Sequence, residues 1–193
     1  MAAFLHLHSQ FSLLDGTATV ETLCDRARAL GLTAVALADT DNAYGHVRFF
    51  RAARERGLKP ILGARLTDPA GAGDAVCLAR DRHGYANLCR LITARRLEDG
   101  FRLAEGLPRL AAGLVVLTRH PTLLERLAGR IERASLFAEL VSWRGETHRG
   151  LVAAARAVGV GVVASPEVRF LDRADRDLHR VLCAVREGTL VSR

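Results

Sequence analysis

The feature that most constrains the fold is a regular alternation of short apolar segments with amphipathic stretches along the 193-residue chain. Short, apolar, β-branched segments are typical of strands that are buried on both faces. Seven segments have this character: Phe4–His8, Ala34–Asp39, Pro60–Ala64, Val76–Arg80, Leu114–Thr118, Phe137–Val141 and Gly161–Ser165. Alternating strands and helices favour parallel strands joined by right-handed crossovers. The pattern therefore predicts an α/β fold, either a barrel or an open doubly wound sheet.

The stretches between these segments have helical periodicity. Thr19 can cap a helix in which apolar residues recur along one face, and Gly31 follows as a stop. Later helices are expected over Tyr44–Arg56, Gly84–Ala94, Pro121–Ala134, Thr147–Val158 and Asp175–Glu187. Asp68–Asp74 is predicted to be a loop, and Leu97–Pro108 is less regular. No linker divides the chain, so residues 1–193 are predicted to form a single domain. No glycine fingerprint follows the first strand, which disfavours a nucleotide-binding sheet.

The composition narrows the class of protein without identifying it. The net charge of +7 is compatible with nucleic acid nearby, but the arginines are scattered and not interleaved with aromatic residues, so charge alone does not predict DNA binding. No apolar run could span a bilayer, and the N-terminus lacks a signal peptide. We expect a cytoplasmic protein with no membrane partner. The cysteines form no C-x-x-C pair and are predicted to be buried free thiols.

Residues with metal-binding chemistry stand where the predicted strands end, which is where β/α barrels place their active sites. His6 and His8 alternate on one strand, so both imidazoles face the same side and could reach one metal ion. The alternative is a pair of rim histidines bonded to the backbone. Asp15 lies in the following loop and Asp39 ends the second strand, and both are candidate ligands. Asp41 and its neighbour Asn42 are better explained as turn or cap residues.

Five segments stand out in order along the chain: 6–16 (HLHSQFSLLDG), 36–45 (ALADTDNAYG), 57–65 (GLKPILGAR), 83–91 (HGYANLCRL) and 163–171 (VASPEVRFL). In this order they resemble the motifs of PHP (polymerase and histidinol phosphatase) domains of bacterial C-family DNA polymerases. The family includes the DNA polymerase III alpha subunit and the error-prone polymerases, and short stretches slightly favour the error-prone branch. The resemblance implies a distorted (β/α)7 barrel with up to three metal ions at the strand ends. Intact members hydrolyse phosphoesters, and some polymerase PHP domains have 3′–5′ exonuclease activity. Family domains continue further, so we expect the chain to be truncated at its C-terminus, as a fragment or a split gene.

The resemblance also identifies which metal ligands survive. His6, His8, Asp15 and Asp39 match family ligands, and His120 stands where a cysteine is usual and could still bind a metal. Other ligand positions are changed: Thr40 for histidine, Arg65 for glutamate, Trp143 for histidine, Glu167 for aspartate and Arg169 for histidine. The remaining histidines, at 46, 83, 148 and 179, are interpreted as surface or structural residues.

Arginine is always charged and has no lone pair to donate to a metal. Two unit charges about 4 Å apart interact by roughly 4 kcal/mol in a partly buried site. Arg65 and Arg169 therefore make a fully occupied three-metal centre unfavourable. We expect them to pair with Asp15, Asp39 and Glu167, so that guanidinium groups replace the metal ions.

No cofactor is expected under this hypothesis. The opposing interpretation is a residual single zinc or manganese ion on His6, His8 and Asp39, with or without His120.

Three functions follow from the resemblance. The first is a non-catalytic structural or docking module of a replicative or error-prone polymerase, acting in DNA replication or repair. Its partners would be a polymerase body in cis or trans and a proofreading exonuclease subunit, with DNA reached through the parent polymerase. The second is a metal-dependent phosphoesterase acting on a 3′ DNA end or a small phosphate ester. The third is a module that holds a phosphate in an arginine-lined mouth without cutting it.

Overall fold

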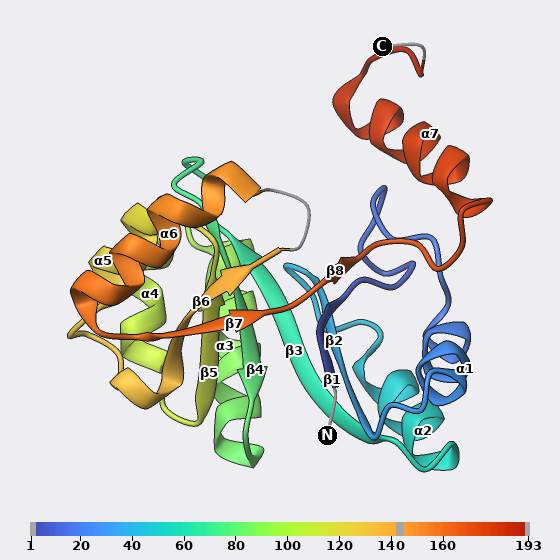
Figure 1. Ribbon diagram of the computed structural model, residues 1–193, viewed down its shortest axis with the longest axis horizontal. Helices are drawn as coiled ribbons and strands as arrows, with labels where there is room; N and C mark the ends of the chain where they lie inside the picture. Colours follow the sequence, from blue (N-terminus) through green and yellow to red (C-terminus); the bar gives the residue numbers. More distant parts are fainter. Residues whose placement is uncertain (1–2, 142–144, 192–193) are drawn as a thin grey trace.

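The computed structural model describes residues 3–141 and 145–191, and Trp143 lies outside these ranges. An eight-stranded sheet runs in the order β7-β6-β5-β4-β3-β2-β1-β8 and curls strongly on itself (Figure 1). Its strands are β1 Ala3–Leu7, β2 Ala34–Thr40, β3 Lys59–Thr67, β4 Asp74–Ala79, β5 Leu114–Thr118, β6 Leu136–Leu140, β7 Gly161–Ala164 and β8 Glu167–Val168.

One run of chain brings the two edges of the sheet together. β7 pairs with β6 and β8 pairs with β1, both in parallel, and only Ser165 and Pro166 separate β7 from β8. The chain therefore crosses from one edge to the other, as the run from β7 to β8 in Figure 1 shows. The fold is a distorted β/α barrel, and this prediction is confirmed.

The prediction that the strands are all parallel is wrong at β4. This strand is antiparallel to both β3 and β5. Only the loop 68–73 joins β3 to β4, which is too short for the crossover that a parallel neighbour needs. The hairpin places Asp74, at the start of β4, opposite Thr67 at the end of β3. It thereby brings Asp74 to the same end of the barrel as Arg65.

Most helices begin and end close to the predicted positions. They are α1 Val20–Ala29, α2 His46–Glu55, α3 Arg82–Leu97, α4 Leu103–Leu110, α5 Pro121–Leu127, α6 Gly145–Val158 and α7 Asp175–Glu187, with a 3-10 turn at Arg133–Ser135. The Thr19 hydroxyl accepts from Thr22 N and caps α1, as predicted. Helix α4 was missed because Pro108 lies inside it, although Leu103 and Leu107 bury one face. None of the described helices is long and apolar enough to cross a membrane.

Successive side chains on each strand point alternately outward, into the core between sheet and helices, and inward, into the barrel interior. Leu37 packs outward with α1 and α2, whereas Ala38 points inward. At one end of the barrel the interior is filled by apolar side chains, those of Ala36, Ala38, Val76, Leu78 and Leu117. Because this end is packed with apolar side chains, the polar residues on the same strands gather at the opposite end, which forms the mouth of the barrel.

Candidate functional site

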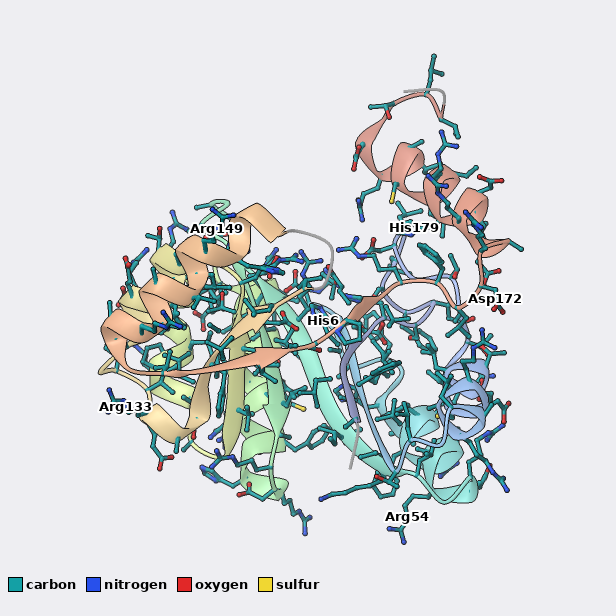
Figure 2. The ribbon with its side chains drawn as sticks, viewed as in Figure 1. His6, Arg54, Arg133, Arg149, Asp172 and His179 are labelled. Atoms are coloured by element: carbon teal, nitrogen blue, oxygen red, sulfur yellow. The ribbon has the colours of Figure 1, made fainter. Side chains whose placement is uncertain are left out.

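Two histidines and a glutamate converge inside the barrel mouth. His6 on β1 lies opposite Glu167 on β8 in the parallel register, so both side chains face the interior. His6 Nε2 lies 3.8 Å and His8 Nε2 3.6 Å from Glu167 Oε1. The three side chains are buried, and Figure 2 shows His6 near the centre of the molecule.

The second ring nitrogen of each histidine fixes its orientation. His6 Nδ1 lies 3.0 Å from Glu139 Oε1 on β6, a carboxylate that can only accept. His8 Nδ1 lies 2.9 Å from Ser12 Oγ, whose own proton goes to Asp39. In its neutral form each histidine therefore carries the proton on Nδ1 and presents an Nε2 lone pair toward Glu167. In the described part of the chain, neither buried Nε2 has a hydrogen-bond partner.

This donor set fits one metal ion. Two imidazole nitrogens and a carboxylate are ligands that zinc or manganese accepts, and the Glu139 contact is the kind that supports a histidine ligand. Burial lowers the pKa of His8, more strongly than its neighbour Glu167 raises it, which favours the neutral ring that a metal requires. The residues that would hold the ion are His6, His8 and Glu167. The set expected from the sequence contained Asp39 in place of Glu167.

Two arginines also converge on Glu167. Arg169 Nη2 donates to Glu167 Oε1 at 2.5 Å, and Arg119 Nη1 donates to Oε2 at 2.7 Å. Burial alone would raise the pKa of the Glu167 carboxyl. Positive charge from His8 and His6 when they are protonated, together with the permanent charge of Arg169 and Arg119, instead holds that pKa well below its usual range. Glu167 is therefore an ionised carboxylate whose charge is already balanced.

Arg169 also reaches the loop after β1. Its Nη1 donates to Asp15 Oδ1, to which Arg186 Nη1 donates as well at 2.9 Å. Arg169 thus bridges Asp15 and Glu167, which is the pairing that the charge argument expected for it. Its role in place of a metal ion stays a prediction.

The pairing expected for Arg65 is wrong. Its Nη2 donates to Asp74 Oδ2 at 2.7 Å, and Arg119 Nη2 donates to the same oxygen at 2.9 Å. The hairpin between β3 and β4 explains this, because it lines up both side chains on the interior face. The pKa of the Asp74 carboxyl lies well below its usual range, because contacts with His120, Arg65 and Arg119 outweigh the effect of burial.

Asp39 lies on the other face of the sheet. It is in register with Ala64, whose side chain packs in the outer core, whereas the next residue, Thr40, is in register with Arg65. Asp39 accepts from Ser9 N at 2.7 Å, from Ser9 Oγ at 2.7 Å and from Ser12 Oγ at 2.6 Å. The structure therefore places Asp39 as an anchor for the loop after β1, where it reaches the histidine pair only through Ser12.

His120 is also separate from that pair. Its Nε2 lies 3.5 Å from Asp74 Oδ2, and its side chain is 39% exposed. The described residues bring no third histidine into the cluster of His6, His8 and Glu167. Of the five ligands expected from the sequence, only His6 and His8 meet.

Sequence reasoning missed four residues of the mouth: Asp74, Arg119, Glu139 and Arg186. Two of them carried a usable signal. Arg119 follows directly after the predicted strand that ends at Thr118, and Glu139 is the lone charge inside an apolar strand. Asp74 had been placed in a loop, and Arg186 comes from α7, beyond the barrel strands.

Comparisons with known proteins identify the family to which the chain is similar. The family model described as "PHP domain" matches residues 5–181. An error-prone DNA polymerase of Anaeromyxobacter sp. (strain K) is 36% identical over 215 residues, covering 99% of this chain and 19% of that protein. The DNA polymerase III subunit alpha of Escherichia coli (strain K12) is 32% identical over 218 residues, covering 96% of this chain and 19% of the relative. The chain thus spans about a fifth of the length of these curated relatives.

Solved structures share the fold at low sequence identity. A candidate metal-dependent phosphoesterase of Bifidobacterium adolescentis has a TM-score of 0.62 at 18% identity, covering 87% of both chains. An amidohydrolase of Chromobacterium violaceum, determined with bound sulfate and no metal, has a TM-score of 0.61 at 19% identity, covering 88% of both chains. At this identity the two structures support the fold alone.

Proposed function

Because the chain belongs to the PHP domain family, we propose that it serves as the PHP module of a bacterial error-prone or polymerase III alpha-type DNA polymerase. It would act in DNA replication or repair synthesis as a structural and docking domain. The identity of 36% over nearly the whole chain to an error-prone polymerase supports this assignment. The proposed main partner is a polymerase body, in cis or in trans, with a proofreading exonuclease as a further one. DNA would be reached through the parent polymerase, in the cytoplasm.

The observation that carries a non-hydrolytic role is the convergence of Arg119 and Arg169 on Glu167. Buried carboxylates need a counter-charge, because an unpaired ion in the interior costs several kcal/mol. The two arginines, with Arg65 and Arg186, supply that charge to Asp15, Asp74 and Glu167. The mouth would then be held together without a multinuclear metal centre.

A domain exchange tests the module role. The matching region of the Anaeromyxobacter error-prone polymerase is replaced by this chain, and primer extension is compared with that of the parent polymerase. The proposal predicts a soluble hybrid that extends primers. It also predicts that Arg169→Gln in the hybrid lowers the thermal midpoint. A folded hybrid that cannot extend primers, combined with efficient phosphoester hydrolysis by the chain alone, would contradict it.

A second candidate function is a one-metal phosphoesterase. It is favoured by the two buried Nε2 atoms of His6 and His8, which face Glu167 without hydrogen-bond partners. A bound zinc or manganese ion would supply Lewis acidity and an activated water there. The chain itself would orient the two imidazoles through Glu139 and Ser12. Hydrolysis of an aryl phosphate or labelled single-stranded DNA in manganese, abolished by His8→Ala, would establish this function.

The third function, phosphate capture by free arginines, is not favoured. Arg65, Arg119 and Arg169 each already donate to a carboxylate in the mouth. A phosphate would have to displace these carboxylates, which are buried and ionised. The proposed function therefore does not include a phosphate-holding role.

A further inference from the structure

Helix α7 carries a histidine and a cysteine that the barrel mouth does not use, next to an arginine that also pairs with Asp15 of the mouth. His179, Cys183 and Arg186 lie four and three residues apart, so they share one face of the helix. Figure 1 shows α7 standing out from the barrel, and Figure 2 shows His179 at its base, toward the loop after β1. His179 and Cys183 group with Asp15 and not with His6, His8 and Glu167.

The contacts of His179 determine which ring nitrogen carries the proton. Nδ1 lies 2.8 Å from the backbone carbonyl oxygen of Asp15, which can only accept. The proton is therefore on Nδ1, and Nε2 presents its lone pair to Cys183 Sγ, 3.5 Å away. The ring of Phe170, with its centroid 5.5 Å from that of the imidazole, packs beside it. His179 is thus an oriented base next to a thiol.

Arg186 adds a permanent positive charge next to the sulfur. Its Nη2 lies 3.6 Å from Cys183 Sγ, while its Nη1 donates to Asp15 Oδ1. A cation beside a sulfur stabilises the negative charge that the sulfur carries when it attacks. A nucleophile, a base and a group that orients the base are the parts that activate a cysteine.

The other three cysteines lack this combination. Cys24 and Cys77 are buried, and burial raises the pKa of their thiols to about 11 and about 12. Cys89 is partly exposed, as Cys183 is, so the prediction that the cysteines are buried is wrong for these two. The Cys89 thiol lies next to the phenol of Tyr85, which is a much weaker base than an imidazole. Cys89 is therefore a matched reference within the same chain.

We propose that Cys183 is a site of covalent modification, and that it reacts selectively with peroxides. The thiol proton moves to His179 Nε2 and the sulfur attacks one oxygen of hydrogen peroxide. The S–O bond forms as the O–O bond breaks, and the leaving hydroxide takes the proton from His179 and departs as water. The sulfur loses two electrons to the peroxide and becomes a sulfenic acid. This reaction does not depend on the function proposed for the barrel mouth.

The test compares Cys183 with Cys89 in one sample. The chain is exposed to limiting hydrogen peroxide with dimedone, which traps sulfenic acid, and adducts are timed by peptide mass spectrometry. We expect Cys183 to be labelled at least about tenfold faster than Cys89. A parallel series with iodoacetamide measures thiol reactivity without an oxidant, and the same order is expected.

Variants on α7 separate activation from mere exposure. His179→Gln and Arg186→Gln should each slow labelling of Cys183 several-fold. Arg180→Gln, on the same helix and paired with Asp177, should leave it unchanged. Far-ultraviolet circular dichroism checks that the helix content is retained. Equal labelling of Cys183 and Cys89 in the unaltered chain overturns the proposal, and so do unchanged rates in both variants.

Discussion

Arg169 donates through Nη2 to Oε1 of Glu167, the same oxygen that faces the free Nε2 atoms of His6 and His8. A guanidinium therefore lies on the side of the carboxylate where a metal ion would bind. Its other nitrogen, Nη1, reaches Asp15, so one side chain links β8 to the loop after β1. In this bridge the guanidinium of Arg169 supplies a positive charge to the two carboxylates, where a bound metal ion would otherwise do so.

Removing the bridge should destabilise the fold. Arg169→Gln would leave two buried carboxylates with one fewer partner each. Arg169 is about one-fifth exposed, so we discount the full cost of breaking a buried pair and expect a loss of roughly 2–3 kcal/mol in the free energy of unfolding. Urea denaturation measures it. Arg26→Gln, which breaks the exposed pair with Asp172, should cost less than about 1 kcal/mol. Equal losses in the two variants would show that the bridge has no special role.

The stability of the fold should fall in acid. The pKa values of Asp74 and Glu167 are lower in the folded state than their ordinary values of 3.8 and 4.5. The unfolded chain therefore binds more protons, and the stabilisation that is present above about pH 4.5 is lost as the pH falls further. Denaturation curves between pH 7 and pH 3 measure the slope of the free energy of unfolding against pH. Glu167→Gln should flatten it, and a slope that this variant does not change would rule out Glu167 as its source.

Asp39 should matter for stability and, through Ser12, only indirectly for metal binding. Asp39→Asn would place an amide among three donors, leaving at least one of them unpaired, at a cost of about 2 kcal/mol. If the unaltered chain binds zinc, titration by calorimetry should show that Asp39→Asn still binds it, with an affinity lowered by no more than about tenfold through Ser12, whereas His8→Ala should lose the binding. Loss of zinc affinity with unchanged stability in Asp39→Asn would make Asp39 a ligand after all.

Gly16 should be intolerant of any side chain. A Cβ at this position would lie 2.0 Å from the carbonyl oxygen of Ser9, so the loop that carries Asp15 would have to move. We expect Gly16→Ala to cost roughly 2–3 kcal/mol, measured by thermal or urea denaturation. Gly150→Ala on α6 is the matched control, because nothing lies within 4 Å of its Cβ and alanine favours the helix. A Gly16→Ala variant as stable as the control would contradict the loop geometry.

The sequence predicted the parts of the fold that depend on local pattern. The alternation of strands and helices predicted an α/β fold, and the resemblance to PHP domains selected the barrel over an open sheet. The two-residue spacing of His6 and His8 placed both imidazoles on one face. The sequence did not give the direction of β4, because the predicted strands left residues 65–75 between them, a gap close to the length of a crossover, whereas the observed strands leave only residues 68–73. The partner of Arg65 depended on that reversal and was therefore missed.

The sequence also did not predict on which face of the sheet a residue at the end of a strand lies. Asp39 and Thr40 are adjacent, and only the register against Ala64 and Arg65 shows that Thr40 faces the interior. Arg119 and Arg186 enter the mouth from elements far apart in the sequence. Their convergence on carboxylates is a tertiary effect, which periodicity does not encode.

Metal stoichiometry tests the central claim, that arginines balance the carboxylates of the mouth in place of a multinuclear centre. The chain is dialysed against zinc or manganese, and bound metal is counted by inductively coupled plasma mass spectrometry. The same is done for His8→Ala and for a double variant, Arg65→Glu with Arg169→His. The account predicts at most one ion per unaltered chain, none in His8→Ala, and more in the double variant. Two or more tightly held ions in the unaltered chain would contradict it.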